Sequence, residues 1–165
     1  MIKTNIQWKS IATNRYALLY ADQPNLKAVL TCDLTKHSFT LEVNGKIYRL
    51  LQKGFWSQTI QWVDDLDFVV VELNQENTFV GKYSLQYADE FYQLEFANLP
   101  LVTLQLYQSD ALLAAYGLGV EDQRVQFVMR SSGTIAPLLE ATLFALMYPY
   151  ALENIGFQAM NVIGI

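Results

Sequence analysis

Short apolar segments with a two-residue alternation recur along the chain as far as residue 130. In one of them Tyr92, Leu94 and Phe96 fall on one side, while Gln93 and Glu95 fall on the other. This period predicts β-strands that each bury one face. We expect strands at residues 6–8, 15–21, 27–34, 37–43, 46–52, 56–63, 67–73, 78–84, 90–97, 100–107, 110–118 and 123–130. About twelve short strands are typical of an antiparallel barrel or sandwich.

The clearest local signal is a hairpin around Asn44-Gly45. This dipeptide supplies the two positive φ angles that a type I′ turn requires. A two-residue turn here pairs Val43 with Lys46 and sets the register of both strands. The side chains that this register places on the core face are Phe39, Leu41, Val43, Tyr48 and Leu50.

The pattern changes at residues 135–152, where Ala, Leu and Met dominate and predict a helix. Thr134 is its expected N-cap, and Pro137 is tolerated in the first turn. The helix is apolar all round, which requires protein or lipid on every side. We expect burial inside the β structure, with Leu143 and Leu146 fully enclosed.

A stable membrane span is not expected. Such a span needs about 20 apolar residues, and Glu140 and Pro149 interrupt this stretch. The predicted fold is therefore one domain over residues 1–165, an antiparallel barrel (strands within 6–130) that encloses helix 135–152. Residues 153–165 form a tail, either an added strand or a docked segment. A lipocalin-like barrel with an empty cavity is the alternative, and it leaves the helix uncovered.

This order of elements resembles the tubby C-terminal-like superfamily, which includes tubby domains, phospholipid scramblases and LURP-one-related proteins. The resemblance covers residues 6–152 and rests on element order, length and segments such as 39–51 and 138–150. It implies a twelve-stranded barrel around a central helix, lipid or protein contact, and no established enzyme activity. The basic phosphoinositide site of tubby does not map onto this chain residue by residue, and the scramblases' cysteine-rich region has no counterpart.

Composition and charge narrow the class of protein further. The net charge is −5, which argues against nucleic-acid binding because phosphate contacts need Lys and Arg. Cys32 is the sole cysteine, so no intramolecular disulfide forms. The N-terminal segment lacks the apolar run of a signal peptide. We expect a cytoplasmic location, with peripheral membrane contact as a further option.

Catalytic patterns are sparse. His37 is the only histidine, and neither a nucleophile elbow nor a phosphate-binding loop is present. Asp64, Asp65 and Asp67 lack the alternating ligands of a calcium loop and predict an acidic turn. Glu140 needs a partner or a raised pKa on a buried helix, and its first-turn position suits the helix dipole. We expect no cofactor or metal.

A basic surface remains as the candidate site. The hairpin register places Arg49 and Lys53 on the outer face and aligns Lys36 opposite Lys53. An anion bound there would relieve the repulsion between these lysines. We expect a non-catalytic binding or scaffolding module, with an unknown protein or an anionic membrane surface as partner. The alternatives are a small-ligand-binding barrel or an enzyme with a rim site that uses Glu140, His37 or the aspartate turn.

Overall fold

A computed structural model describes residues 6–33, 35–36, 38–53, 58–77, 81–97, 101–131, 134–155 and 162–164. The strands are β1 (Ile6–Ala12), β2 (Arg15–Tyr20), β3 (Ala28–Asp33), β4 (Ser38–Val43), β5 (Lys46–Lys53), β6 (Thr59–Val63), β7 (Val69–Asn77), β8 (Lys82–Tyr87), β9 (Glu90–Ala97), β10 (Thr103–Gln108), β11 (Ala111–Glu121), β12 (Arg124–Ser131) and β13 (Val162–Gly164). The helix is α1 (Pro137–Ile155).

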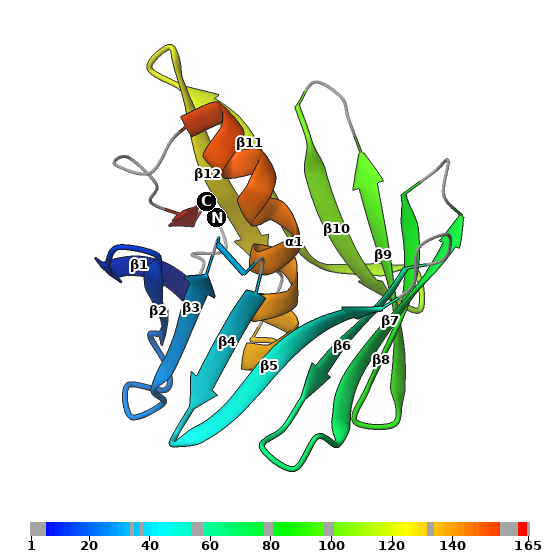
Figure 1. Ribbon diagram of the computed structural model, residues 1–165. Coiled ribbons are helices and arrows are strands. Elements are labelled where there is room, and N and C mark those ends of the chain that lie inside the picture. Colours follow the sequence, from blue (N-terminus) through cyan, green and yellow to red (C-terminus); the bar gives the residue numbers. More distant parts are fainter. Residues whose placement is uncertain are drawn as a thin grey trace.

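The sheet is a continuous meander. Each strand from β1 to β11 pairs antiparallel with the next one in sequence, and β13 adds parallel to β12. β13 also contacts β1, so the sheet curls into a nearly closed barrel. Figure 1 shows α1 running inside the curve of the sheet. The predicted class, a barrel of about twelve antiparallel strands around one C-terminal helix, is confirmed.

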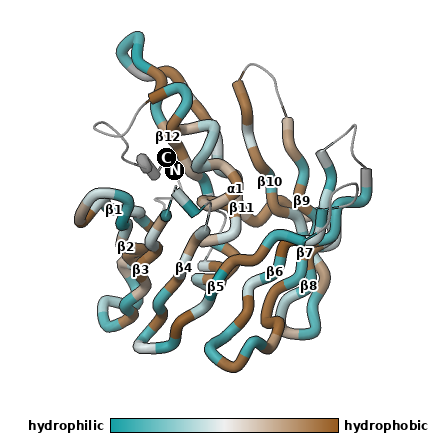
Figure 2. Tube along the Cα trace, in the orientation of Figure 1, coloured by the Kyte–Doolittle hydropathy of each residue, from teal (hydrophilic) through white to brown (hydrophobic). Residues whose placement is uncertain are grey.

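The β4–β5 hairpin has the predicted register. Asn44 and Gly45 have φ angles of 48° and 86°, as the turn chemistry demands. Val43 pairs with Lys46, and Leu41 pairs with Tyr48. Leu41 is fully buried, so the predicted core face is the inner face of the barrel. Hydrophobic and hydrophilic residues alternate along the strands in the same way elsewhere (Figure 2).

α1 holds the core together through an aromatic cluster near its middle. The ring of Phe144 lies 4.7 Å from Trp8, 4.9 Å from Tyr16 and 5.3 Å from Phe127, measured between centroids. β1, β2 and β12 therefore meet on one side of the helix. Trp62 reaches α1 from β6, because its Nε1 donates a hydrogen bond of 2.9 Å to Thr142 Oγ1.

The structure corrects three details of the sequence-based expectations. α1 covers Pro137–Ile155 rather than residues 135–152, and Thr134 hydrogen-bonds Asp22 through its hydroxyl. β1 extends to Ala12, because its exposed second half still pairs with β2. Leu143 is fully buried as predicted, but Leu146 is only half-buried, because it faces a pocket described below.

The C-terminal tail contributes an added strand, β13, which was one of its two predicted forms. Within the parts of the chain that the structure describes, no helix combines the length and the apolar character needed to cross a membrane.

Candidate functional site

A pocket of about 490 Å³ opens at the end of the barrel where α1 finishes. We call it the end pocket. The last turns of α1 form one side through Leu146, Pro149 and Tyr150. The inner faces of several strands form the other side, with Phe39 from β4, Leu50 from β5, Ile60 from β6, Tyr83 from β8 and Phe96 from β9. These side chains make the interior of the pocket largely apolar.

The pocket exists because α1 does not run along the middle of the barrel. The helix packs most extensively against β11 and β12, and it also contacts β10, β4 and β3. Near its C-terminal end, this leaves the inner faces of β5, β6 and β8 incompletely covered. Contacts between aromatic rings partly close the gap. The ring centroid of Phe96 lies 5.8 Å from that of Tyr150 and 6.3 Å from that of Tyr83.

Polar groups gather at the rim of the end pocket. Asp33, Gln52 and Gln58 line it. The hydroxyl of Thr35 donates to Asp33 Oδ1 at 2.8 Å, and the Lys36 backbone N–H donates to the same oxygen at 3.2 Å. The Thr35 hydrogen bond is the main reason that the pKa of Asp33 is lowered. The rim thus combines an ionised carboxylate with amide groups and a neighbouring lysine.

The three predicted basic residues do not form one cluster. Lys36 is exposed and lies beside rim residue Asp33. Lys53 is exposed and pairs with Thr59, which stands between rim residue Gln58 and Ile60. Arg49 lies four residues before Lys53 on β5 and forms an ion pair with Asp67. Lys36 and Lys53 are therefore the two members that adjoin residues of the rim, although neither lines the end pocket.

The predicted pairing of Lys36 with Lys53 lies outside the observed ladder between β4 and β5. The β4–β5 pairing ends at Thr40 and Arg49, and Lys36 belongs to a turn before β4. On the outer face near Lys53, Glu72 accepts hydrogen bonds from Asn74 and Gln61. The hydrogen bond from Asn74 is the main cause of a lowered Glu72 pKa, with Lys53 contributing through its charge.

Glu140 lies in a buried hydrogen-bond chain. It is 0% exposed. Trp8 Nε1 donates to the Tyr116 hydroxyl at 2.7 Å, and that hydroxyl donates to Glu140 Oε2. Glu140 Oε1 has no hydrogen-bond partner among the described residues. Burial raises the pKa of Glu140 from 4.5 to about 7, against the opposing effect of the Tyr116 hydrogen bond. Glu140 thus has both a side-chain partner on β11 and a raised pKa.

The acidic turn between β6 and β7 has the structural role expected for it. Asp64 Oδ1 accepts the backbone N–H groups of Leu66 and Phe68, each at 2.9 Å. Asp67 adopts a φ of 62° and pairs with Arg49. His37 lies outside the described residues. Among the residues that the structure does describe, no three His, Cys, Asp or Glu side chains group as metal ligands would.

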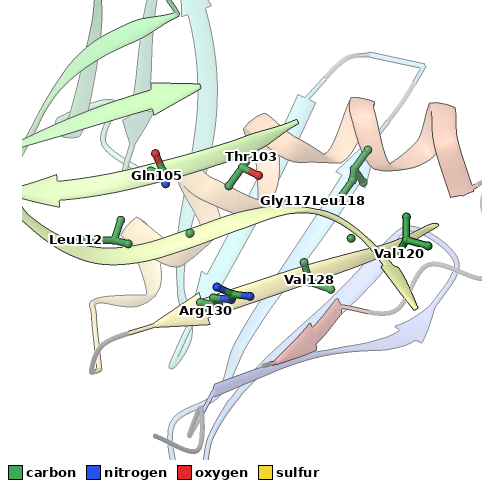
Figure 3. Close-up of a pocket in the computed structure, with 10 residues that line it drawn as sticks. Thr103, Gln105, Leu112, Gly117, Leu118, Val120, Val128 and Arg130 are labelled. Carbon is green, nitrogen blue, oxygen red and sulfur yellow. The ribbon is translucent and has the colours of Figure 1, made fainter. Parts of the chain in front are cut away.

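A second hollow lies on the outer face of β10, β11 and β12, and Figure 3 shows it in close-up. We call it the outer groove, and its volume is about 550 Å³. In Figure 3, Leu112 and Arg130 lie toward one end and Val120 toward the other. Gly117 and Gly119 stand between them on β11.

Comparison with known proteins assigns neither a family nor a function to this chain. No protein-family model, no curated protein and no solved structure matches this chain. The end pocket and the outer groove therefore carry the functional argument. Neither was predicted from the sequence, because each depends on how distant strands and α1 come together.

Proposed function

We propose that this protein is a non-catalytic binding module that takes the apolar chain of an anionic amphiphile into the end pocket. The observation that carries the proposal is the apolar pocket itself, bounded by α1 on one side and by β4, β5, β6 and β8 on the other. Its volume of about 490 Å³ lies within the range of small-molecule sites, roughly 300–1,000 Å³.

The two lysines beside the rim outnumber its one carboxylate, Asp33, and this balance favours an anionic head group. Lys36 and Lys53 are exposed and adjoin the rim without lining the pocket: the Lys36 N–H bonds to rim residue Asp33, and Lys53 follows rim residue Gln52 on β5. A lysine ammonium at this position contacts a phosphate or carboxylate while the acyl chain lies among Phe39, Leu50 and Ile60. The resemblance to the tubby-like superfamily also supports binding of an anionic amphiphile, since it implies lipid or protein contact. On this proposal the protein acts at an anionic membrane surface of the cytoplasm.

A binding role is favoured over catalysis at the residues singled out from the sequence. Glu140 is fully enclosed and its hydrogen-bond partner is a core tyrosine. Asp64 and Asp67 use their carboxylates to hold the β6–β7 turn and to pair with Arg49. None of these carboxylates lines the end pocket.

Two assays test the proposal. Displacement of a fluorescent fatty acid measures occupancy of the pocket, and co-sedimentation with vesicles, with and without anionic lipid, measures the head-group contact. Leu146→Trp fills the pocket from the helix side, so fatty-acid binding should weaken at least about tenfold. Leu19→Trp adds the same ring on the outer face of β2, where Leu19 is exposed, and should leave binding unchanged.

Lys36→Glu/Lys53→Glu should weaken vesicle binding. Each basic residue near an anionic surface contributes about 1 kcal/mol, so loss of two amounts to about a 30-fold change. The matched control is Lys27→Glu/Lys46→Glu, which makes the same charge change at two exposed residues beside the Asn44-Gly45 turn, at the other end of β5 from Lys53. The proposal is wrong if the wild type neither binds the fatty acid nor co-sediments with anionic vesicles at low salt.

A further inference from the structure

The β6–β7 connection presents two large apolar side chains to solvent. Leu66 is 71% exposed and Phe68 is 66% exposed. We call residues 64–69 the acidic turn, because Asp64, Asp65 and Asp67 surround these two side chains. Exposed side chains of this size on a rigid element are typical anchors of a protein interface.

The acidic turn is held in one conformation by its own backbone and side chains. Asp64 N–H donates to Phe68 O at 2.9 Å, and Asp67 N–H donates to Asp64 O at 3.1 Å. Asp64 Oδ1 accepts two further N–H groups, and Asp67 pairs with Arg49. Little conformational entropy is left to lose when this turn docks, which favours binding.

The outer groove complements the acidic turn, because it combines an apolar surface with a positive charge. Its apolar surface comes from Leu112, Val120 and Val128, over the glycines of β11. Arg130 is the charged residue that lines it, and Arg130 is exposed. Within the described part of the chain, neither ion pair involves Arg130. A groove of this kind fits an apolar segment that carries a carboxylate.

We infer that the acidic turn of one copy of this chain docks into the outer groove of a second copy, with Leu66 and Phe68 on the apolar surface and Asp65 facing Arg130. Asp65 is the aspartate available for this contact, because Asp64 caps the turn and Asp67 pairs with Arg49. Three aspartates would oppose an anionic membrane, so the turn suits a protein surface rather than lipid.

The two surfaces cannot meet within one molecule. β6 and β7 lie on the opposite side of the barrel from β11 and β12 (Figure 1). The contact is therefore head-to-tail, and the resulting pair keeps one free groove on the first copy and one free turn on the second. Head-to-tail contacts grow into open chains or closed rings. This inference does not depend on the end pocket or on the proposed function.

Sedimentation analysis of the full chain, up to about 1 mM protein, measures the association. The wild type should self-associate with increasing concentration. Leu66→Ser/Phe68→Ser should weaken the association at least about tenfold, as should Val120→Asp/Arg130→Glu on the groove side. Phe91→Ser removes an equally exposed side chain (70%) outside both surfaces and should change nothing. Arg15→Glu is the matched charge control, since Arg15 is exposed on β2.

Mixing the two weakened variants gives the sharpest test. The turn variant keeps an intact groove, and the groove variant keeps an intact turn. An equimolar mixture should form a one-to-one complex and stop there, because no further pair of intact surfaces remains. A wild type that stays monomeric overturns the inference, as does a mixture that stays monomeric or an association that survives in both variants. Circular dichroism of each variant confirms that it is folded.

Discussion

The hydroxyl of Tyr116 on β11 donates a hydrogen bond to Glu140 in the first turn of α1, and both side chains are fully buried. Glu140 is thus an ionisable group placed in the core with a single donor among the described residues. Its carboxylate form lacks the several hydrogen bonds that stabilise a buried charge, so burial favours the protonated form. Tyr116 and the nearby Tyr20 stay neutral, because burial raises the pKa of each well above 10.

This arrangement predicts a pH-dependent stability. The pKa of Glu140 is about 7 in the folded state, against 4.5 ordinarily. Between these values the unfolded chain has lost its proton while the folded protein keeps it. The free energy of unfolding therefore falls as the pH rises from about 4.5 to 7, by about 3 kcal/mol from this residue. Above pH 7 both states are ionised and this loss is complete.

Glu140→Gln should remove that loss, and urea denaturation at pH 5 and pH 8 measures it. The difference between variant and wild type cancels the contribution of every other titrating group. Glu153→Gln is the matched control, because Glu153 is exposed in the same helix. Equal pH dependence in wild type and Glu140→Gln would show that the buried carboxyl does not titrate in this range.

Two leucines one turn apart on α1 should differ in their contribution to stability. Leu143 is fully buried, so Leu143→Ala should cost about 2–5 kcal/mol through lost burial and a new cavity. Leu146 already faces the end pocket and is half-buried, so Leu146→Ala should cost only about 1 kcal/mol. Chemical denaturation measures both variants. Similar costs would contradict the pocket on the Leu146 side of the helix.

Gly117 on β11 should tolerate a side chain poorly. A Cβ there would lie 2.8 Å from Thr103 Oγ1 and 3.0 Å from the backbone oxygen of Val102, so β10 would have to shift. Gly117→Ala should destabilise the protein by about 1–3 kcal/mol. Gly119→Ala is the comparison, because its Cβ would meet only the methyl groups of Val128 at 3.3 Å. Urea denaturation should rank Gly117→Ala as clearly the more damaging, and the reverse order would contradict the close approach of β10.

The strand order could be predicted from the sequence because its signals are local. A two-residue period and turn residues every ten positions act between neighbours along the chain. Twelve predicted segments correspond to β1–β12 in order. The largest shift is at β8 (Lys82–Tyr87), predicted at 78–84. β7 runs through polar residues to Asn77, because backbone pairing with β8 continues where neither face needs apolar side chains.

By itself the sequence determined that this is an antiparallel barrel with a buried helix, since a helix without a polar face must be surrounded. Tertiary structure alone decided which side of the barrel the helix approaches, and hence the end pocket beside Leu146. It also decided that Tyr116 is the partner of Glu140, 24 residues away, and that Arg49 is held by Asp67. Such pairings depend on how a curved sheet brings distant strands together, and no local periodicity encodes that distance.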